Sequence, residues 1–501
     1  MSSIKKLAGQ TIWYGASSIA ARFINYLLTP YLTYTLANTS DYGKMGLIYS
    51  LIPILNIIFI YGFETAYFRF ASNPENKSSI YSTASISIIV STLIFSTLLW
   101  YNQSMMGTVT GLSAFPKIIQ YSIIVIAFDA LSTIPFARLR EEGKPRKFAF
   151  IKISSILINI FFTWFFISYC PAELKKYPVS PLKFIYDVNT NPIVYVLLAN
   201  VIQSAFTYLL LFSEIKKINF QFNFKLWKEM MVYSLPLIIV GMGGMINETF
   251  DRLMLRWLIP GDVEFKEQQV GIYNACYKLS ILITLFIQAF RMGAEPFFFK
   301  QAEGLNPQKT YARVMKFFVL VISVMFLVVS LYMSVWKYFI GPKYWEGLAV
   351  VPILLLANMF LGIYYNLSIW YKVSNKTMAG AAITVLGAAI TILINYILIP
   401  KFGYMACAWA TFICYATMMV ISFSWGQKVY PIPYAWKKLI AYITIVVLLL
   451  FVHQTWINFF PGNFSNLLTA TILLILYMLF IIQIEKKEFS QIPYLSKLIK
   501  K

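Results

Sequence analysis

The sequence predicts an all-α polytopic membrane protein with about 14 transmembrane helices, and three observations lead to this fold class. Of its 501 residues, 59% are hydrophobic and 12% are charged, which is more apolar surface than a soluble protein of this length can bury. The apolar residues gather in runs of about 20, the length of helix that crosses a bilayer. Lys and Arg gather in alternate connections between these runs, as expected for a polytopic membrane protein.

The first apolar run is longer than the core of a signal peptide and ends without a small-residue cleavage site, so we expect it to be retained as a span. The polar stretches between runs are too short to fold as domains, and the longest of them is 171–192. The expected spans are, in order, residues 10–36, 43–63, 80–101, 118–137, 149–169, 193–213, 232–259, 270–292, 314–335, 348–371, 380–399, 404–425, 438–458 and 466–484.

Basic residues set the expected orientation. Most of the 42 Lys and Arg residues fall in the connections on the same side as the N-terminus, including 138–147, 214–218 and the C-terminal tail. The positive-inside rule assigns this side to the cytoplasm, and an even number of spans places both termini there. The net charge of +22 follows from this bias and from attraction to anionic lipid rather than from binding to nucleic acid.

The two halves of the chain resemble each other at an offset of roughly 230 residues. The matched pairs are Arg22 and Arg252, Leu28 and Leu258, Pro30 and Pro260, Gly43 and Gly271, Tyr49 and Tyr277, Glu64 and Glu295, Phe68 and Phe299, Arg69 and Lys300, and Lys144 and Lys376. The offset corresponds to six spans, so the halves form a parallel pseudo-two-fold repeat of two six-helix lobes around a central cavity, as in transporters that work by alternating access. We expect an N-terminal lobe at 1–215, a C-terminal lobe at 216–430, and the thirteenth and fourteenth spans with a basic cytoplasmic tail at 431–501.

Five stretches carry a family resemblance through their order and spacing. They are TIWYGASSIAARFINYLLTPYLTYTL followed by YGKMGLI, FARLREEGKPRKFA after the fourth span, SLPLIIVGMGGMINETFDRLML followed by VGIYNACYKL, EPFFFKQA after the eighth span, and NYILIPKFGYMACAWAT across spans 11 and 12. In these stretches the chain resembles the MOP exporter superfamily, and within it the polysaccharide transporter branch of O-antigen and oligosaccharide-repeat flippases, which is related to lipid II flippases and MATE exporters.

The resemblance implies a V-shaped cavity between two six-helix lobes, with spans 13 and 14 added to this core. It implies a substrate that is an undecaprenyl-pyrophosphate-linked oligosaccharide, moved to the outer leaflet of the bacterial inner membrane for surface polysaccharide synthesis. We therefore expect membrane lipids as surroundings, a glycan polymerase and glycosyltransferases of the same pathway as partners, and a monomeric transporter without a cofactor.

Ionisable groups inside a span are costly and point to function. Arg22 lies in the first expected span, which has no carboxylate, and Arg252 lies at the equivalent depth of the seventh. The repeat predicts that these two arginines face each other across the cavity, where guanidinium groups can bind pyrophosphate oxygens. Arg291 and Arg69 are expected to add positive potential near the cytoplasmic mouth. The alternative for Arg22 and Arg252 is a structural role, and Glu248, one turn before Arg252, could form an ion pair with it.

Two carboxylates are specific to the second half. Glu248 and Asp251 have no counterparts in the first half, where Ser18 and Ala21 stand at the equivalent places. We expect one of the two carboxylates to neutralise Arg252 and the other to be available to bind a coupling ion, either H⁺ or Na⁺.

Three further carboxylates are candidates for coupling or gating. Asp129 lies in the fourth span, where it serves either ion coupling or a hydrogen-bonded structural role. Glu64 and Glu295 lie at the cytoplasmic ends of their spans, each before an aromatic and basic cluster. We expect them to form gating or structural ion pairs with Arg69 and Lys300.

The remaining reactive residue types favour packing roles. His453, the only histidine, lies outside the repeat and is expected to be a packed neutral imidazole rather than a proton relay. The four cysteines have no spacing typical of a disulfide or a metal site. We expect no catalytic residue and no metal site, because a membrane enzyme such as a glycan polymerase or an O-acyltransferase would need a catalytic His or a large polar outer loop.

Two other transporter classes remain open. A multidrug exporter of the same superfamily would need an acidic cavity for cationic drugs, whereas the repeat-matched residues here are arginines. A lipid II flippase carries the same pyrophosphate and has the same charge requirement. The five quoted stretches resemble the O-antigen and capsule branch more closely.

Overall fold

The computed structural model describes residues 19–71, 79–219, 221–302 and 306–489. Over these residues the regular structure is helical, and thirteen helices are long and apolar enough to cross a membrane. They correspond one for one to the second to fourteenth expected spans. The first expected span is helical at residues 19–26 and again in α2, and its remaining part lies outside the described residues. The predicted all-α multi-span fold is confirmed.

The helices follow the apolar runs closely. The long helices α7, α8, α10 and α14 each have a proline as their first residue, where the missing N–H costs nothing. The first group consists of α2 (Leu28–Thr35), α3 (Thr39–Ile60), α4 (Phe63–Ala71), α5 (Ile80–Tyr101), α6 (Gln103–Thr110), α7 (Pro116–Glu141), α8 (Pro145–Trp164), α9 (Cys170–Lys176), α10 (Pro192–Leu210) and α11 (Phe212–Ile215). The second group consists of α12 (Phe224–Leu258), α13 (Val263–Ala302), α14 (Pro307–Ser330), α15 (Met333–Trp336), η5 (Pro342–Ala349), α16 (Val350–Leu367), α17 (Ile369–Val373), α18 (Thr377–Phe402) and α19 (Tyr404–Val429). The chain then continues through α20 (Trp436–Phe459), α21 (Asn463–Ile484) and α22 (Lys486–Phe489).

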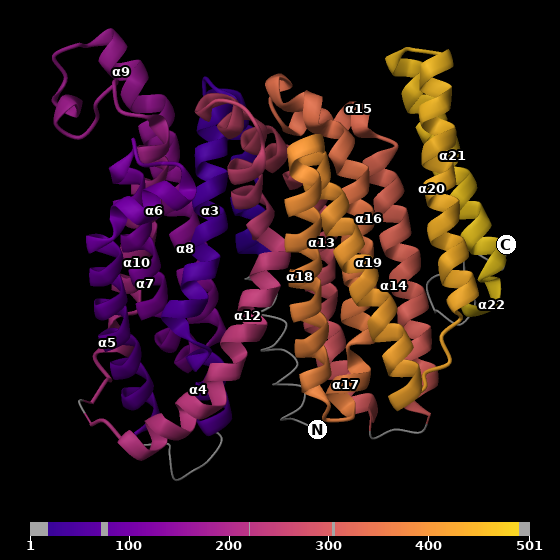
Figure 1. The fold of residues 1–501 in the computed structure, drawn as a ribbon, viewed down its shortest axis with the longest axis horizontal. Helices are drawn as coiled ribbons and strands as arrows, with labels where there is room; N and C mark the ends of the chain where they lie inside the picture. Colours follow the sequence, from indigo (N-terminus) through magenta and orange to yellow (C-terminus); the bar gives the residue numbers. More distant parts are fainter. Residues whose placement is uncertain (1–18, 72–78, 220, 303–305, 490–501) are drawn as a thin grey trace.

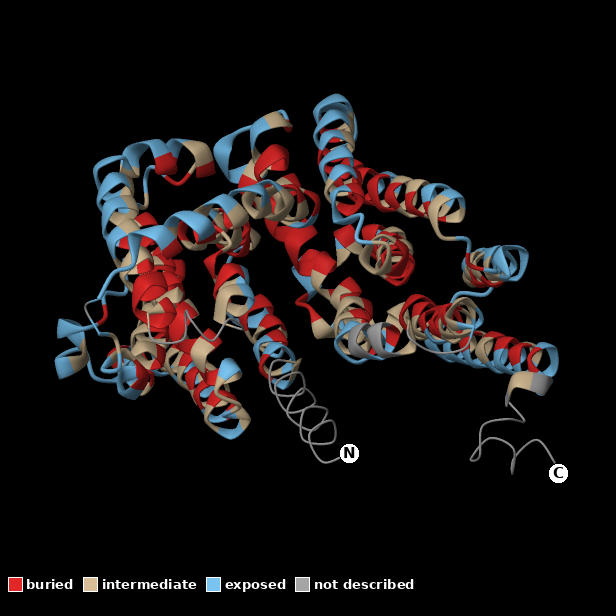
Figure 2. Cartoon of the chain, turned by 90° about the horizontal axis from the view of Figure 1, so that it is seen from below, coloured by how far each residue is buried: buried red, intermediate tan, exposed pale blue. Residues whose placement is uncertain are grey.

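The two groups of helices stand side by side, and α20 and α21 lie at one edge of the molecule (Figure 1). Buried residues line the facing sides of the helices, and exposed residues lie mostly on the outward sides (Figure 2). Large apolar side chains on the outward sides, such as Leu93, Phe150 and Tyr396, are exposed, as expected where lipid rather than water surrounds the protein. The division of the chain at residues 215 and 430 stays a prediction.

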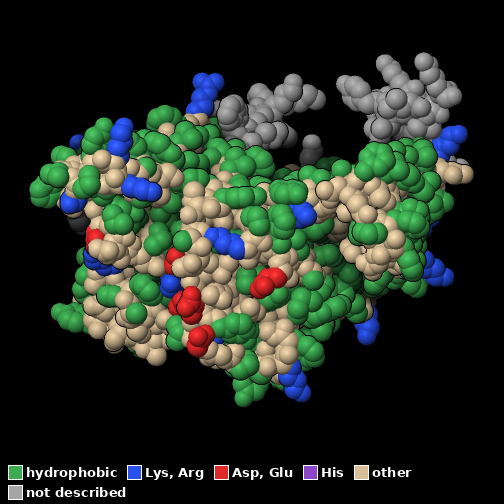
Figure 3. All heavy atoms as spheres, turned by 90° about the horizontal axis from the view of Figure 1, so that it is seen from above, with side chains coloured by type: hydrophobic (Ala, Val, Ile, Leu, Met, Phe, Trp, Pro, Cys, Tyr) green, Lys and Arg blue, Asp and Glu red, His purple; other side chains and the backbone are tan. Residues whose placement is uncertain are grey.

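One end of the molecule, called here the basic end, carries the connections 138–147, 212–218 and 372–376, near α4 and α17 in Figure 1. The opposite end, called the far end, carries α6, α9 and α15. Figure 3 views the far end and shows Asp and Glu side chains gathered near its middle. The predicted topology would place the basic end in the cytoplasm.

The two groups of helices are in tight contact at the far end, where α3 meets α13. The repeat-matched Gly43 and Gly271 meet here, and a Cβ added to either would overlap a backbone carbonyl oxygen of the other helix. Next to this contact, the buried Lys44 lies 2.9 Å from the carboxylate of Asp41 and 3.6 Å from that of Glu267. Small residues allow close helix approach in membranes, so the far end is closed by helix packing and by buried charges.

Helices α20 and α21 pack against α14 and are held near the basic end by charged groups. Glu485 at the end of α21 accepts hydrogen bonds from Lys316 at 2.9 Å, Lys438 at 3.1 Å and Tyr442 at 2.6 Å. His453 of α20 is buried, and its Nε2 lies 2.9 Å from the carbonyl oxygen of Leu331. This is the packed environment that the sequence predicts for this imidazole.

Candidate functional site

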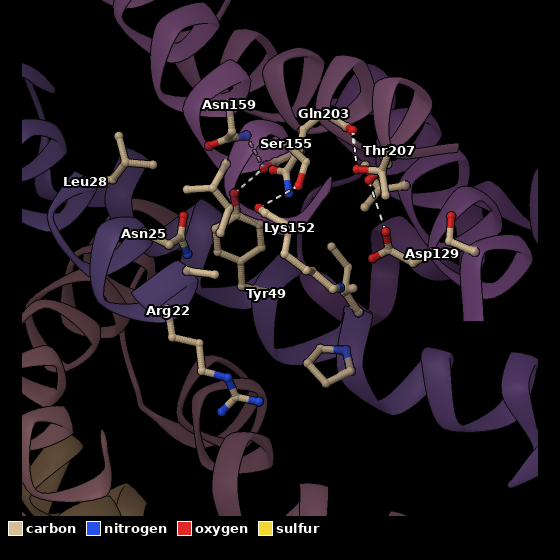
Figure 4. A pocket seen from close by; sticks show the side chains of 18 of the residues that line it. Arg22, Asn25, Leu28, Tyr49, Asp129, Lys152, Ser155, Asn159, Gln203 and Thr207 are labelled. Carbon is tan, nitrogen blue, oxygen red and sulfur yellow. Dashed lines mark hydrogen bonds between the residues drawn. The ribbon is translucent and has the colours of Figure 1, made fainter. Parts of the chain in front are cut away.

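A cavity of ≈ 750 Å³ lies within the first group of helices, in the size range of ligand-binding pockets. Its walls come from residues 21–32, α3, α4, α7, α8 and α10, and Lys278 of α13 is the one lining residue from the second half among the described residues. Figure 4 shows Arg22 and Asn25 on one side of this space and polar side chains of α8 and α10 on another. The sequence predicted a cavity between the lobes, and this cavity lies mainly in the N-terminal half.

Within the described part of the chain, four cations and two carboxylates line the cavity. The cations are Arg22, Arg140, Lys152 and Lys278, and the carboxylates are Glu64 and Asp129. Arg140 forms an ion pair with Glu64 near the basic end. Three cations then face one carboxylate in the remaining space, so the cavity has an excess of positive charge.

The three remaining cations have few protein partners. Arg22 is exposed and donates a hydrogen bond to the side-chain carbonyl of Gln288 on α13, a neutral group. The ammonium of Lys152 lies 4.2 Å from the centre of the Phe136 ring. Lys278 has no hydrogen bond or ion pair within the described part of the chain. Cations at membrane depth are stable only beside water, a counter-charge or a bound anion, so the cavity is suited to an anionic ligand.

Arg252 has a different environment from its repeat mate. Its guanidinium is buried, lies 2.8 Å from Asp251 Oδ1, and donates a 2.5 Å hydrogen bond to the backbone carbonyl of Glu248. It also lies 4.1 Å from the centre of the Tyr277 ring. Asp251 accepts a second hydrogen bond, at 2.6 Å, from the Tyr273 hydroxyl. Arg252 is therefore neutralised within the second half and is not among the residues that line the cavity.

The repeat explains this difference. Ala21 occupies the place equivalent to Asp251 and lines the cavity beside Arg22. The first half therefore has no carboxylate next to its arginine. Glu248, the other carboxylate specific to the second half, has an exposed side chain.

The other predicted site residues do not gather at one place. Asp129 lines the cavity and accepts a 3.0 Å hydrogen bond from Ser204 of α10. The guanidinium of Arg69 lies 4.2 Å from the ring centre of Tyr233 on α12. The expected Glu64–Arg69 pair is wrong, because Glu64 of α4 pairs instead with Arg140 near the end of α7.

Arg291 lies on α13 outside the cavity lining, with its guanidinium 4.6 Å from the centre of the Tyr365 ring. The side chains of Glu295 and Lys300 lie outside the described residues, so their expected pairing stays a prediction. No group of three or more His, Cys, Asp or Glu side chains that could hold a metal ion occurs in the residues that the structure describes.

Sequence reasoning missed the polar side chains of α8 and α10. Lys152, Ser155 and Asn159 are spaced by three and four residues on α8, so they share one helix face. Asn200, Gln203, Ser204 and Thr207 repeat this spacing on α10. All seven residues line the cavity. The pattern that could have predicted them is a polar stripe on each of two otherwise apolar helices.

Comparison with known proteins agrees with this architecture. The model of the family described as "Polysaccharide biosynthesis protein" matches residues 7–301. A relative in Haemophilus influenzae, "Lsg locus putative protein 1", is 21% identical over 387 residues, which cover 72% of this chain and 86% of the relative.

Solved structures show the same fold. The lipid II flippase MurJ in an inward closed conformation superposes with a TM-score of 0.67 at 14% identity, covering 94% of this chain and 99% of that one. An inward-facing multidrug resistance MATE family transporter of the MOP superfamily superposes with a TM-score of 0.60 at 12% identity, covering 84% of this chain and 95% of the other. The chain, with thirteen helices able to cross a membrane among its described residues, is a multi-pass membrane protein and belongs to the polysaccharide biosynthesis protein family.

Proposed function

We propose that this protein is a flippase for undecaprenyl-pyrophosphate-linked oligosaccharides, working by alternating access in the bacterial inner membrane with both termini in the cytoplasm. The observation that carries the proposal is the cationic cavity, in which Arg22, Lys152 and Lys278 face a single carboxylate. The family and the fold support a transporter for polysaccharide precursors.

Arg22 is the proposed contact to the pyrophosphate. A guanidinium presents several N–H donors in a fixed plane that matches two phosphate oxygens, and it stays charged at any physiological pH. Lys152 and Lys278 add point charges without fixed geometry. Arg252, being paired with Asp251, serves the structure of the second half in this account.

The positive cavity disfavours a multidrug exporter for cationic drugs. The same charges suit a lipid II flippase, because lipid II also carries a pyrophosphate. Expression in a strain depleted of its own lipid II flippase separates these two functions. We expect no restoration of growth, and full restoration would assign the protein to lipid II.

Deletion of the gene in its host tests the proposal directly. The lipid-linked oligosaccharide is then labelled from the outer side of the membrane with a reagent that does not cross it. We expect outer-leaflet labelling to fall and unlabelled precursor to accumulate, and a plasmid copy of the gene to reverse both effects. Unchanged labelling without accumulation would contradict the proposal.

The coupling ion is a further part of the proposal. Asp129 inside the cavity and the exposed Glu248 are the carboxylates that we propose for H⁺ or Na⁺ coupling. Glycosyltransferases and a glycan polymerase of the same pathway are the proposed partners.

A further inference from the structure

The wall of the cavity formed by α8 and α10 carries the cation Lys152, but its other polar groups differ in chemistry from the side that carries Arg22. Asn159, Asn200 and Gln203 present neutral amides to the cavity, and Tyr49 of α3 stands beside them. Figure 4 shows Asn159 and Gln203 away from Arg22, with Tyr49 between the two sides. A pyrophosphate site alone has no need of these groups, since neutral amides neutralise no charge.

The amides form a directed chain of hydrogen bonds. Asn159 Nδ2 donates to Asn200 Oδ1 at 2.8 Å, and Asn200 Nδ2 donates in turn to the Tyr49 hydroxyl at 2.5 Å. The two bonds fix these side chains in place on three helices. Each amide group has two donor hydrogens and an acceptor oxygen, so the chain leaves capacity for further hydrogen bonds toward the cavity.

Gln203 has the largest unused capacity on this wall. Its backbone carbonyl accepts a 2.8 Å hydrogen bond from Thr207, but its side-chain amide makes no hydrogen bond within the residues described. An amide that lines a cavity at membrane depth without a protein partner is satisfied by water or by a ligand.

The chemistry of this wall matches an uncharged sugar. Sugar hydroxyl and N-acetyl groups both donate and accept hydrogen bonds, and side-chain amides do the same. The Tyr49 side chain adds an apolar ring face next to a polar hydroxyl. A lipid tail would leave the amides unsatisfied, and a second phosphate would meet acceptor oxygens as well as donors.

We propose that the amide wall, defined by Asn159, Asn200, Gln203 and Tyr49, is a subsite for the uncharged sugar nearest the pyrophosphate. It deepens the proposed function and rests on it, because the sugar reaches this wall only when the pyrophosphate is bound at Arg22. The two subsites have different roles. The cations bind the pyrophosphate that all such substrates share, and the amide wall discriminates between glycans.

Binding to the purified full-length protein in lipid nanodiscs tests the proposal. The probes are undecaprenyl pyrophosphate without sugar and the same lipid carrying N-acetylglucosamine, N-acetylgalactosamine or galactose. We expect the wild-type protein to bind at least one sugar-bearing probe about tenfold more tightly than the bare lipid, the gain expected from one or two neutral hydrogen bonds. Gln203→Met and Asn159→Leu should remove most of this preference and leave the affinity for the bare lipid unchanged.

Two controls make the outcome specific. Gln120→Met removes an amide on α7 that does not line the cavity, and it should keep the sugar preference. Arg22→Gln should weaken binding of all four probes. Gln203 has no side-chain hydrogen bond to lose among the described residues, so its variant stays informative even where Asn159→Leu reduces folding.

The possible failures are distinguishable. Equal wild-type affinity for all four probes, or a sugar preference that survives both amide variants, would overturn the sugar subsite and leave the flippase proposal standing. Absence of wild-type binding to every probe, the bare lipid included, would overturn the proposed function and the sugar subsite with it.

Discussion

Ala21 and Asp251 occupy equivalent places in the two halves, and each stands next to an arginine. Asp251 lies 2.8 Å from Arg252 and neutralises it in a buried pair. Ala21 offers Arg22 no such partner, so Arg22 lines the cavity without an ion pair to any carboxylate that the structure describes. One residue type at one position thus separates a structural arginine from one suited to binding an anion.

Ala21→Asp should create beside Arg22 the pairing that Asp251 gives Arg252, and it should reduce transport of the lipid-linked oligosaccharide by about tenfold or more, since a charge-assisted hydrogen bond to substrate is lost. Ala21→Asn, which has a similar shape and no charge, is the control. Transport is measured by outer-side labelling in complemented deletion cells. Equal activity of the Asp and Asn variants would remove Arg22 from the substrate path.

Arg252 leads to a prediction about stability. Arg252→Gln leaves the buried Asp251 carboxylate without its counter-charge, which should cost about 3 kcal/mol in the free energy of unfolding. Arg22→Gln should leave stability nearly unchanged, because Arg22 is exposed. Thermal unfolding of both purified variants measures this difference. A wild-type melting temperature for Arg252→Gln would show that the pair contributes nothing to folding.

At the scale of helices, α3 and α13 close the far end through the contact of Gly43 with Gly271. Backbone carbonyl groups fill the space where side chains would be, and a helix backbone cannot rotate aside as a side chain can. The buried Lys44, Asp41 and Glu267 stand next to this contact. The conformation closed at the far end therefore depends on the absence of two Cβ atoms.

Gly43→Ala should push α3 and α13 apart at the far end. Spin labels at Asn38 and Asp262, both exposed near this contact, should show a distance distribution shifted to longer values by electron–electron double resonance. Gly244→Ala is the matched control, because a Cβ there meets nothing within 4 Å. An unchanged distribution in a folded Gly43→Ala protein would contradict the closing role of this contact.

The connection between α7 and α8 at the basic end is stabilised by ion pairs of Glu142, and the charge of this carboxylate depends on pH. Burial opposes ionisation of Glu142, but hydrogen bonds from Lys144 and Arg138 outweigh burial and lower the pKa of Glu142 from 4.5 to about 2. A lowered pKa in the folded protein means that this stabilisation is complete above about pH 4.5 and is lost as the pH falls toward 2.

Hydrogen exchange of residues 138–147, corrected for the intrinsic effect of pH, measures this loss. We expect protection to be constant near neutral pH and to fall as the pH drops below 4.5. Glu142→Gln should show low protection at all of these pH values. A pH-independent protection in the wild-type protein would contradict the assigned role of the Glu142 contacts.

Over the whole molecule, the fold could be predicted from the sequence for two reasons. Bilayer thickness determines the length of an apolar run that spans the membrane, and the Lys and Arg residues between these runs indicate which connections lie on the same side. The expected span 80–101 coincides with α5, whereas α12 begins at Phe224, eight residues before the expected 232, since amphipathic turns at a membrane surface carry polar residues. The repeat matched Gly43 with Gly271, and these two glycines meet in space.

The site was less predictable, because repeat symmetry says where residues lie and not which partners they find. Symmetry placed Arg22 and Arg252 on one cavity, but the adjacent Asp251 keeps Arg252 inside the second half. Arg140 pairs with Glu64 although the two are far apart in sequence, so spacing alone could not identify this pair. The polar stripes of α8 and α10 could have been predicted from helical periodicity. They show that a polar face on an apolar helix indicates a residue set that lines a cavity.

Transport in vesicles measures whether the protein moves a lipid-linked oligosaccharide across a bilayer and whether Arg22 is needed for it. The purified protein is reconstituted into liposomes with fluorescent undecaprenyl-pyrophosphate-linked oligosaccharide, and a membrane-impermeant quencher reports the fraction that crosses the bilayer. We predict rapid crossing with the wild-type protein, partial crossing with Arg22→Lys and crossing near that of empty liposomes with Arg22→Ala. Crossing at the rate of empty liposomes with the wild-type protein, or full activity of Arg22→Ala, would contradict the account.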